Sequence, residues 1–386
     1  MKSLAGEKCT GCESCVSICP KKCITMQLSN GFYYPEVNEQ MCIDCKQCEV
    51  VCPALHPVNK SDTVKPSVYA AISSDKGTRQ QSSSGGVFSL LAEEIIKTNG
   101  IVFGACFEQF SFNVVHKGIT STNELSILRG SKYVQSSINS SFSETEKALK
   151  NGKTVLFSGT PCQIAGLKMF LRNEYDKLFC IQVICHGVSS PVLWQKYVSY
   201  IEDKYSSVLR SFNFRDKETG WKNFSVSGTT SDGTVFSRPN FADPYMQLFL
   251  YNYSLRSSCF NCRFKGNSML ADITLGDFWQ INNIQPDFND NKGTSLVVLH
   301  TEKGKALFES ISSELKSMEL PYEKAIANNI AYNKSSYQPE NYVNFKKDIS
   351  VLPFKTIYKK YIVLNKKHTK EYMFNVLRAE KIKLLS

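Results

Sequence analysis

The sequence predicts a multidomain protein of α+β and α/β class, in which a small cysteine-rich module precedes an α/β domain and a C-terminal α+β region. Two cysteine runs of identical spacing stand near the N-terminus. Strand and helix patterns then alternate, which predicts a mostly parallel sheet. Short strand patterns follow, with a hairpin turn at Asp232-Gly233. The expected boundaries are 1–58, 67–205, 206–320 and a basic helical tail at 321–386.

The two cysteine runs, CTGCESCVSICP and CIDCKQCEVVCP, share the spacing C-x2-C-x2-C-x3-C-P. Bacterial two-cluster ferredoxins have this spacing, and the fourth cysteine of each run binds the other cluster. We therefore expect a bacterial-ferredoxin-like module with two 4Fe-4S clusters. Two zinc sites are the alternative, but zinc loops rarely have this triple spacing. The expected ligands are Cys9, Cys12, Cys15 and Cys52 for one cluster, and Cys42, Cys45, Cys48 and Cys19 for the other.

Cys23 falls outside the spacing and is expected to fill a small buried position beside a short strand. The stretch GFYYPEV predicts a hairpin strand between the two runs. A polar linker with two prolines, ALHPVNKSDTVKPSV, ends the module.

The α/β domain is predicted from apolar periodicity and from glycine and proline at helix ends. Ligands gather where the strands of such sheets end and the helices begin. The expected strands are 67–72, 101–107, 154–159 and 178–184, and the expected helices are 85–99, 141–152, 162–173 and 191–205.

One of these helix starts, QQSSSGGVFSLL, has the features of an anion site. Glycines permit close backbone approach, serines can donate hydrogen bonds, and a helix N-terminus favours negative charge. Phosphate or pyrophosphate binding by Ser83, Ser84, Gly85 and Gly86 is one interpretation, and a serine cap in a flexible loop is the other. The stretch RGSKYVQS, with Arg129, Ser131, Lys132 and Tyr133, would add contacts to the same ligand or form an ordinary exposed loop.

Four further cysteines suggest a third cluster. Cys162 and Cys185 follow consecutive predicted strands, and equivalent ends of neighbouring parallel strands lie side by side. Cys259 and Cys262 form a C-x2-C pair. We expect these four residues to bind a third 4Fe-4S cluster.

Two alternatives remain for this group. Cys162 at a helix N-terminus would have a lowered pKa and act as a nucleophile with His186 as its base. The four cysteines would otherwise hold a structural zinc ion. Cys106 and Cys180 lie in apolar strands and are expected to be core residues.

Six stretches in this order, SSSGGVFSLL, GSKYVQS, SGTPCQIAGL, CHGVSSP, SCFNCRFKG and ADITLGDFW, resemble the beta subunit family of coenzyme F-420-reducing hydrogenase and formate dehydrogenase. Relatives include a ferredoxin-dependent reductase of the chlorophyll cycle. The resemblance spans about 67–280 and weakens after residue 290. It implies a bound FAD, at least one 4Fe-4S cluster, and electron flow to a deazaflavin or another organic substrate.

The resemblance implies that the flavin lies at Ser83 to Gly86, Ser131 to Tyr133, Gly159 and Thr160, and that the family's cluster lies at the four dispersed cysteines. Asp277 and Trp279 are also candidates to face the flavin, although Trp279 is more often a core residue in such a position. The sequence identifies no catalytic proton-transfer residue.

The formal net charge of +11 is an overestimate if clusters are bound. Each 4Fe-4S cluster with four thiolates carries roughly −2, so two clusters bring the charge to about +7 and three to about +5. The excess basic residues near the C-terminus form either a solvated helical tail or a docking face for an acidic partner such as a ferredoxin. No nucleic-acid recognition module accompanies the charge.

The sequence-based expectation is a cytoplasmic iron–sulfur flavoprotein oxidoreductase. No apolar run approaches the roughly 18 residues of a membrane helix, and the N-terminus lacks the apolar core of a signal peptide. The expected partners are a redox protein and a small-molecule substrate. The alternatives are an electron-transfer subunit serving a separate catalytic chain, or a Cys162 thiol enzyme with an attached redox module.

Overall fold

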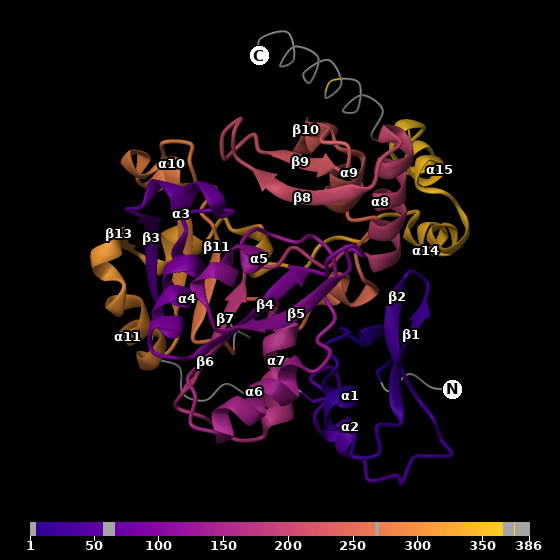
Figure 1. Cartoon of the computed structure of the whole chain (residues 1–386), viewed down its shortest axis with the longest axis horizontal. Helices are drawn as coiled ribbons and strands as arrows, with labels where there is room; N and C mark the ends of the chain where they lie inside the picture. Colours follow the sequence, from indigo (N-terminus) through magenta and orange to yellow (C-terminus); the bar gives the residue numbers. More distant parts are fainter. Residues whose placement is uncertain (1–4, 57–65, 267–269, 366–373, 375–386) are drawn as a thin grey trace.

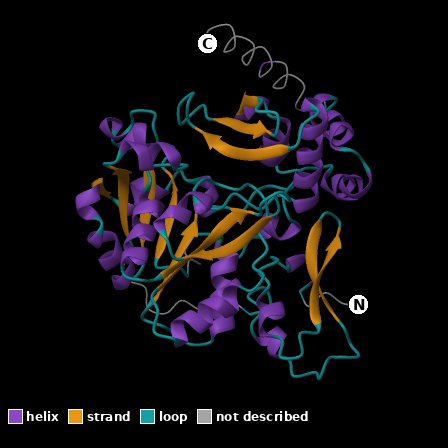
Figure 2. Cartoon of the chain, viewed as in Figure 1, coloured by secondary structure: helices purple, strands orange, loops and turns teal. Residues whose placement is uncertain are grey.

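The computed structural model describes residues 5–56, 66–266, 270–365 and 374. A small N-terminal module packs beside a large mixed sheet covered by helices, and a second, smaller sheet lies at one end of the molecule (Figures 1 and 2).

The N-terminal module repeats one local structure twice. Its helices α1 (Ser14–Ile18) and α2 (Gln47–Val50) begin at matching positions of the two cysteine runs. The residues that precede them, Glu13 and Lys46, both have a positive φ, of 61° and 59°. The predicted repeat is therefore present in the backbone. The hairpin between the halves pairs β1 (Ile24–Ser29) with β2 (Phe32–Val37).

The large sheet has eight strands in the order β13-β3-β12-β11-β7-β6-β4-β5. Only its centre is parallel, where β4, β6, β7 and β11 lie side by side, and the other four strands add antiparallel pairs. The bounds are β3 Ser67–Ser73, β4 Ile101–Phe107, β5 Val114–Ile119, β6 Val155–Gly159, β7 Leu178–Val183, β11 Ile273–Asp277, β12 Ser295–Leu299 and β13 Leu315–Leu320.

The prediction of a mostly parallel sheet is wrong, because half of the strands join it through antiparallel pairs. Strand β3 inserts between β12 and β13, which come much later in the chain, and it runs antiparallel to both. Strands β11, β12 and β13 lie within the predicted region 206–320 yet complete the sheet of the preceding region. Local periodicity assigns strands but carries no information on such distant pairing.

Helices cover both faces of the sheet, and neighbouring residues of a strand point to opposite faces. In β6, Leu156 packs with α4 and α11 on one face, while Phe157 packs with α6 and α7 on the other. Cys106 and Cys180 are buried in these two apolar cores, as predicted. The bounds of the helices around this sheet are α3 Lys76–Gln81, α4 Val87–Lys97, α5 Leu125–Leu128, α6 Ser141–Lys150, α7 Pro161–Leu171, α10 Ile281–Ile284, α11 Glu302–Ser310, α12 Tyr322–Ile326 and α13 Ile330–Asn333.

The smaller sheet packs on helices from three parts of the chain (Figure 1). Its order is β10-β9-β8, and the predicted turn at Asp232-Gly233 joins β9 to β10. The bounds are β8 Leu209–Asp216, β9 Ser225–Thr230, β10 Val235–Pro239, α8 Pro191–Tyr205, α9 Pro244–Leu250, α14 Tyr342–Val351 and α15 Phe354–Tyr358.

Much of the described part of the region predicted as a basic helical tail, 321–386, is packed against the rest of the chain: α12 and α13 lie on the large sheet, and α14 and α15 belong to this core. Phe345, Ile349, Phe354 and Ile357 are buried among residues of α8 and α9. The segment is rich in lysine, so its composition suggested a solvated helix. Its apolar residues nevertheless lie on faces that pack into the core. Nearly all of the predicted tail beyond residue 365 lies outside the described residues.

Helix α7 fastens the N-terminal module to the large sheet. The Ser14 hydroxyl donates to the Gly166 carbonyl at 2.7 Å, across the interface between α1 and α7. A Cβ atom at Gly166 would lie 2.6 Å from Ser14 Oγ and 2.9 Å from Cys12 Cβ. A side chain larger than hydrogen therefore does not fit at this position.

The Gly166→Ala variant should unfold at a lower urea concentration than the wild type, because overpacking a tight contact costs about 1–3 kcal/mol. Gly77→Ala is the matched control, since its new Cβ would meet only the end of the Asp75 side chain, at 3.3 Å. Equal urea midpoints for the two variants would show that α7 and the module are not in close contact.

Candidate metal centres

The first group of cysteines lies in one buried pocket of the N-terminal module, lined by Cys9, Cys12, Cys15 and Cys52. The charge of Cys52, from the second run, interacts with those of Cys12 and Cys15 from the first. Burial is the main cause that raises the pKa of the Cys12 thiol to about 11. The fourth cysteine of the second run is thus placed with the first three of the other run.

The second group lies nearer the surface. Cys19 is close enough to Cys48 for their charges to interact, and Cys42 and Cys45 are exposed. Cys23 is buried beside β1, as predicted, and its sulfur lies 3.5 Å from that of Cys19. The fourth cysteine of the first run is therefore placed toward the second run.

The third group brings together cysteines from three separate segments. Cys162, Cys185, Cys259 and Cys262 line a single cavity. The charge of Cys162 interacts with those of Cys262 and Cys185, and the charge of Cys259 with those of Cys162 and Cys262. The structure thus brings the four dispersed cysteines together.

Hydrogen bonds hold the segments that carry the third group of cysteines. Thr160 and Gln163 form a capping box at the start of α7 and fix the turn that carries Cys162. The Cys262 N–H donates to Ser335 Oγ at 2.9 Å, and Lys265 Nζ donates to the Cys185 carbonyl. Cys259 lies in a 3-10 helix, Ser257–Asn261.

Burial controls the protonation of these thiols. It raises the pKa of Cys185 and of Cys259 to about 12, and it raises the pKa of Cys162 further. A helix N-terminus stabilises a nearby thiolate by at most about 2 kcal/mol. Full burial, in contrast, raises the pKa of a thiol by up to about 3–5 units. Burial therefore argues against the alternative in which the start of α7 lowers the pKa of Cys162.

His186 is also placed for a role other than that of a base for Cys162. Its Nε2 lies 2.7 Å from Asn252 Oδ1, and its ring packs edge-on against Phe249. These contacts hold the imidazole against α9, and the side-chain amide of Asn252 is the hydrogen-bond partner of its Nε2.

The donor set of the third cavity fits a metal group bound by four thiolates. Several buried thiolates repel one another and lose hydration unless a cation binds them. Both an iron–sulfur cluster and zinc take four cysteine ligands. Among the residues that the structure describes, no three His, Cys, Asp or Glu side chains are grouped so as to hold a single metal ion.

The residues implied for the flavin fall into two groups. Ser83 Oγ accepts a hydrogen bond from the Ser131 N–H at 2.8 Å and lies 3.0 Å from Ser131 Oγ, so the two loops meet. Gly159 and Thr160 belong instead to the turn of Cys162, where Thr160 Oγ1 lies 3.2 Å from Cys162 Sγ. Lys132 Nζ donates to two carbonyl groups of its own loop, and burial lowers its pKa to about 7.

Gly85 is required by packing within the protein, which changes the interpretation of the SSSGG loop. A Cβ atom at Gly85 would lie 2.3 Å from the Ala71 carbonyl oxygen and 2.8 Å from the Ser295 nitrogen. Helix α4 is preceded by Gly86 and has no side-chain cap, so the expected serine cap is also absent at this helix.

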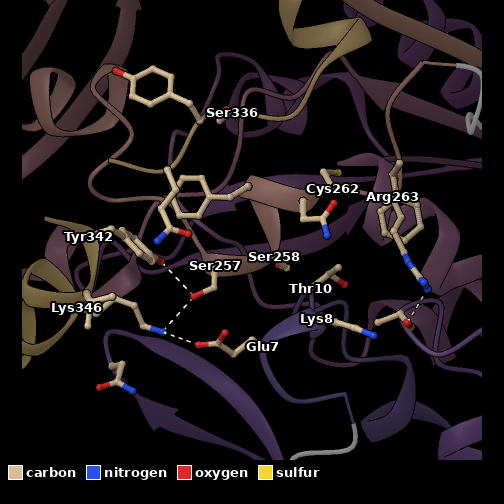
Figure 3. A pocket seen from close by; sticks show the side chains of 18 of the residues that line it. Glu7, Lys8, Thr10, Ser257, Ser258, Cys262, Arg263, Ser336, Tyr342 and Lys346 are labelled. Atoms are coloured by element: carbon tan, nitrogen blue, oxygen red, sulfur yellow. Dashed lines mark hydrogen bonds and ion pairs between the residues drawn. The ribbon is translucent and has the colours of Figure 1, made fainter. Parts of the chain in front are cut away.

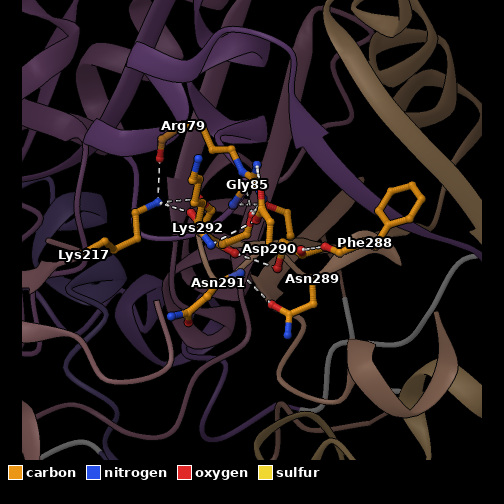
Figure 4. A network of polar contacts seen from close by, with 12 residues as sticks. Arg79, Gly85, Lys217, Phe288, Asn289, Asp290, Asn291 and Lys292 are labelled. Carbon is orange, nitrogen blue, oxygen red and sulfur yellow. Dashed lines mark hydrogen bonds and ion pairs between the residues drawn. The ribbon is translucent and has the colours of Figure 1, made fainter. Parts of the chain in front are cut away.

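A network of polar contacts holds the SSSGG loop in place (Figure 4). Lys217 Nζ donates to the carbonyl groups of Arg79, Ser84 and Lys292. Arg79 in turn makes a two-pronged ion pair with Asp290 at 2.7 and 2.8 Å. Contacts within the protein therefore fix the position of the loop before α4.

Arg215, which the sequence did not single out, joins the two loops to β11. Its guanidinium donates to the Ser83 carbonyl at 3.0 Å and to Asp277 Oδ1 at 3.1 Å. Within the part of the chain that the structure describes, its buried Nε has no hydrogen-bond partner, while the Tyr133 side chain interacts with the guanidinium. A single arginine within a strand belongs to no repeated spacing, so the sequence alone does not reveal its contacts with Ser83 and Asp277.

Trp279 lies beside this arginine, at 5.0 Å from the guanidinium to the ring centroid, and stacks on Trp221. It is 40% exposed, so the expectation of a core residue is wrong. Asp277 also accepts from Trp221 Nε1 at 2.7 Å. The indole of Trp279 and the buried Nε–H of Arg215 therefore lie near the junction of the Ser83 and Ser131 loops.

A larger cavity of about 790 Å³ lies between the N-terminal module and the C-terminal helices (Figure 3). Cys262 of the third group lines it, and so do four basic residues, Lys8, Arg263, Lys346 and Lys347. Glu7 contributes an acidic group and pairs with Lys346 at 3.7 Å.

An uncharacterized polyferredoxin-like protein of Methanocaldococcus jannaschii is 28% identical over 74 residues, which cover 17% of this chain and 44% of that protein, so the match spans less than half of that relative. A chain from the xenon-derivatized F420-reducing NiFe hydrogenase complex of Methanosarcina barkeri aligns with a TM-score of 0.46 and 16% identity, over 80% of this chain and 95% of that chain. In the part of the chain that the structure describes, none of the helices combines the length and apolar character needed to cross a membrane.

Two family models match the chain. Residues 8–55 match the 4Fe-4S dicluster domain, and residues 152–323 match the model for the C terminus of the coenzyme F420 hydrogenase/dehydrogenase beta subunit. Residues 152–323 are therefore similar to the C terminus of the coenzyme F420 hydrogenase/dehydrogenase beta subunit, and residues 8–55 form an N-terminal 4Fe-4S ferredoxin module, so the chain is an iron–sulfur protein with an electron-transfer role.

Proposed function

We propose that this protein is an iron–sulfur flavoprotein that moves electrons between two ferredoxin-type clusters, a third 4Fe-4S cluster, FAD and a deazaflavin or another organic substrate. The observation that carries the proposal is the convergence of Cys162, Cys185, Cys259 and Cys262 on one cavity. Bound clusters carry single electrons, and a bound flavin converts single-electron steps into hydride chemistry.

The proposed ligands follow the two cysteine runs and the third cavity. Cys9, Cys12, Cys15 and Cys52 would hold the first cluster, and Cys42, Cys45, Cys48 and Cys19 the second. The interaction of Cys52 with Cys12 and Cys15 supports this crossed assignment. Cys162, Cys185, Cys259 and Cys262 would hold the third.

Helix α7 supports electron transfer between the first and third groups. Cys162 lies at its start, and Gly166, one turn further on, packs against Cys12. Residues four apart on a helix lie on one face, about 6 Å from each other. The helix thus holds a proposed ligand of each group close to the other, and the charge of Cys162 interacts with that of Cys12.

FAD binding is proposed for the junction of the Ser83 and Ser131 loops. The serine hydroxyls there can bond to a polar ligand, and the buried Arg215 Nε lacks an acceptor that such a ligand would supply. The exposed Trp279 ring offers an apolar face beside them. Asp277 keeps the Arg215 guanidinium oriented toward this junction.

A second candidate function is that of an electron-transfer subunit for a separate catalytic chain. The cavity of Figure 3 favours it, because Cys262 lines this cavity together with the basic residues Arg263 and Lys346. Such a surface attracts an acidic redox partner, including a ferredoxin or a catalytic subunit. Anaerobically purified protein that contains clusters but no flavin would favour this function over the first.

The wild-type protein should contain about twelve iron atoms, and Cys162→Ser about eight, because the variant loses one ligand of the third cluster. Cys106→Ala is the matched control, since this buried cysteine lies in the apolar core away from the three groups. The measurement is iron and zinc content after anaerobic purification.

The other assignments give different metal contents. A structural zinc site predicts about eight iron atoms in the wild type and one zinc that Cys162→Ser releases. A thiol nucleophile predicts an iron content that is unchanged by Cys162→Ser. Either result would contradict the proposed third cluster.

The double variant Ser83→Ala/Ser131→Ala should bind FAD about 5- to 150-fold more weakly, because each of the two lost hydrogen bonds contributes about 0.5–1.5 kcal/mol. Its iron content should remain that of the wild type. Ser82→Ala is the control, since the Ser82 hydroxyl bonds within its own segment, to the Thr78 carbonyl at 2.7 Å. The measurement is FAD titration of the flavin-free protein by fluorescence, and equal affinities in the double variant and the control would remove these loops from the site.

A further inference from the structure

Arg256 is fully buried and crosses the contact between the N-terminal module and the rest of the chain. Its Nε donates to the Cys9 carbonyl at 2.8 Å. One terminal nitrogen donates to Gln135 Oε1 and the other to the Tyr33 carbonyl, both at 3.0 Å. A single side chain thus joins the first cysteine run, the β2 strand and the loop of Ser131.

The guanidinium also contacts a sulfur atom. Its second terminal nitrogen lies 3.5 Å from Cys9 Sγ. Within the described residues, Arg256 forms no ion pair with a carboxylate at 4.0 Å or less. The nearby buried carboxylate of Glu13 accepts instead from the Asn139 N–H at 3.1 Å. The faces of the guanidinium meet aromatic rings, with the centroid of Tyr34 at 4.1 Å.

A charge in such surroundings needs a compensating anion. Carbonyl oxygens satisfy the N–H groups of Arg256, but they do not neutralise its charge. The Cys9 sulfur becomes an anion when it binds iron, and a 4Fe-4S cluster with four thiolates carries about −2. The buried cation and the anionic group are therefore complementary.

The backbone of the same residue supports the third cysteine group. The Arg256 carbonyl accepts from the Cys259 N–H at 2.9 Å, and its N–H donates to the Val188 carbonyl at 3.0 Å. Val188 stands three residues after Cys185. Arg256 therefore contacts a cysteine of the first group through its side chain and one of the third group through its backbone.

We propose that Arg256 is a positioning residue and the built-in counter-charge of the cluster at Cys9, where it raises the reduction potential and holds the module against the Cys259 turn. The inference rests on the proposed function, since it takes the first cluster to be bound at Cys9. A positive charge and an N–H donor beside a ligating sulfur stabilise the more negative, reduced state of the cluster.

The test compares three variants of the full-length, anaerobically purified protein by redox titration followed with electron paramagnetic resonance. Arg256→Gln removes the charge, and Arg256→Lys keeps it without the planar fork. Arg263→Gln is the matched control, because it makes the same charge change seven residues further along while its guanidinium donates to the Ala54 carbonyl (Figure 3). Iron content is measured on every sample.

We expect Arg256→Gln to lower the midpoint potential of the Cys9 cluster by more than Arg263→Gln does, and Arg256→Lys to restore most of the shift. Loss of the cluster's iron from Arg256→Gln but not from Arg256→Lys would support the same conclusion. Equal potentials in Arg256→Gln and Arg263→Gln, or equal effects of Gln and Lys at position 256, would overturn it. Absence of the first cluster from the wild type would contradict the proposed function itself, before any variant is compared.

Discussion

Burial of four thiols around one cavity is the constraint on which the rest of this structure depends. Cys162 and Cys185 follow the adjacent parallel strands β6 and β7, and the 3-10 helix of Cys259 closes the cavity with Cys262. Burial keeps isolated thiols protonated, as the raised pKa values of Cys185 and Cys259 show. A bound metal group reverses this preference, because iron stabilises the thiolates that water no longer reaches.

The contact between the module and the large sheet follows from the same constraint. Gly166 lets α7 approach Cys12 closely, and Arg256 joins Cys9 to the turn of Cys259. Both contacts connect the first and third cysteine groups rather than distant surfaces. On the proposed function, electrons that move between the first and third groups would cross this interface between the two parts of the chain.

The loops proposed to bind FAD are a different kind of site, because polar contacts within the protein hold them in place. Lys217 and Arg79 fix the backbone of the SSSGG loop, and packing against Ala71 requires glycine at position 85 (Figure 4). The rigid loop presents Ser83 toward Ser131. Preorganisation of this kind lowers the entropy cost of binding a ligand.

The local features of the fold could be predicted from the sequence, whereas the long-range pairings could not. The cysteine spacing predicts the repeated module, and the position of Cys162 and Cys185 after consecutive strands predicts their proximity. The place of β3 between β12 and β13 has no local signal. Arg215 and Arg256 were missed for a similar reason, since single buried arginines show no periodicity and acquire their roles only from partners far along the chain.

The most direct test of the central claim is an anomalous-diffraction map recorded at the iron absorption edge from anaerobically grown crystals. We expect three iron peaks, one of them in the cavity lined by Cys162, Cys185, Cys259 and Cys262. Iron peaks confined to the N-terminal module, or a peak at the zinc edge in that cavity, would contradict it.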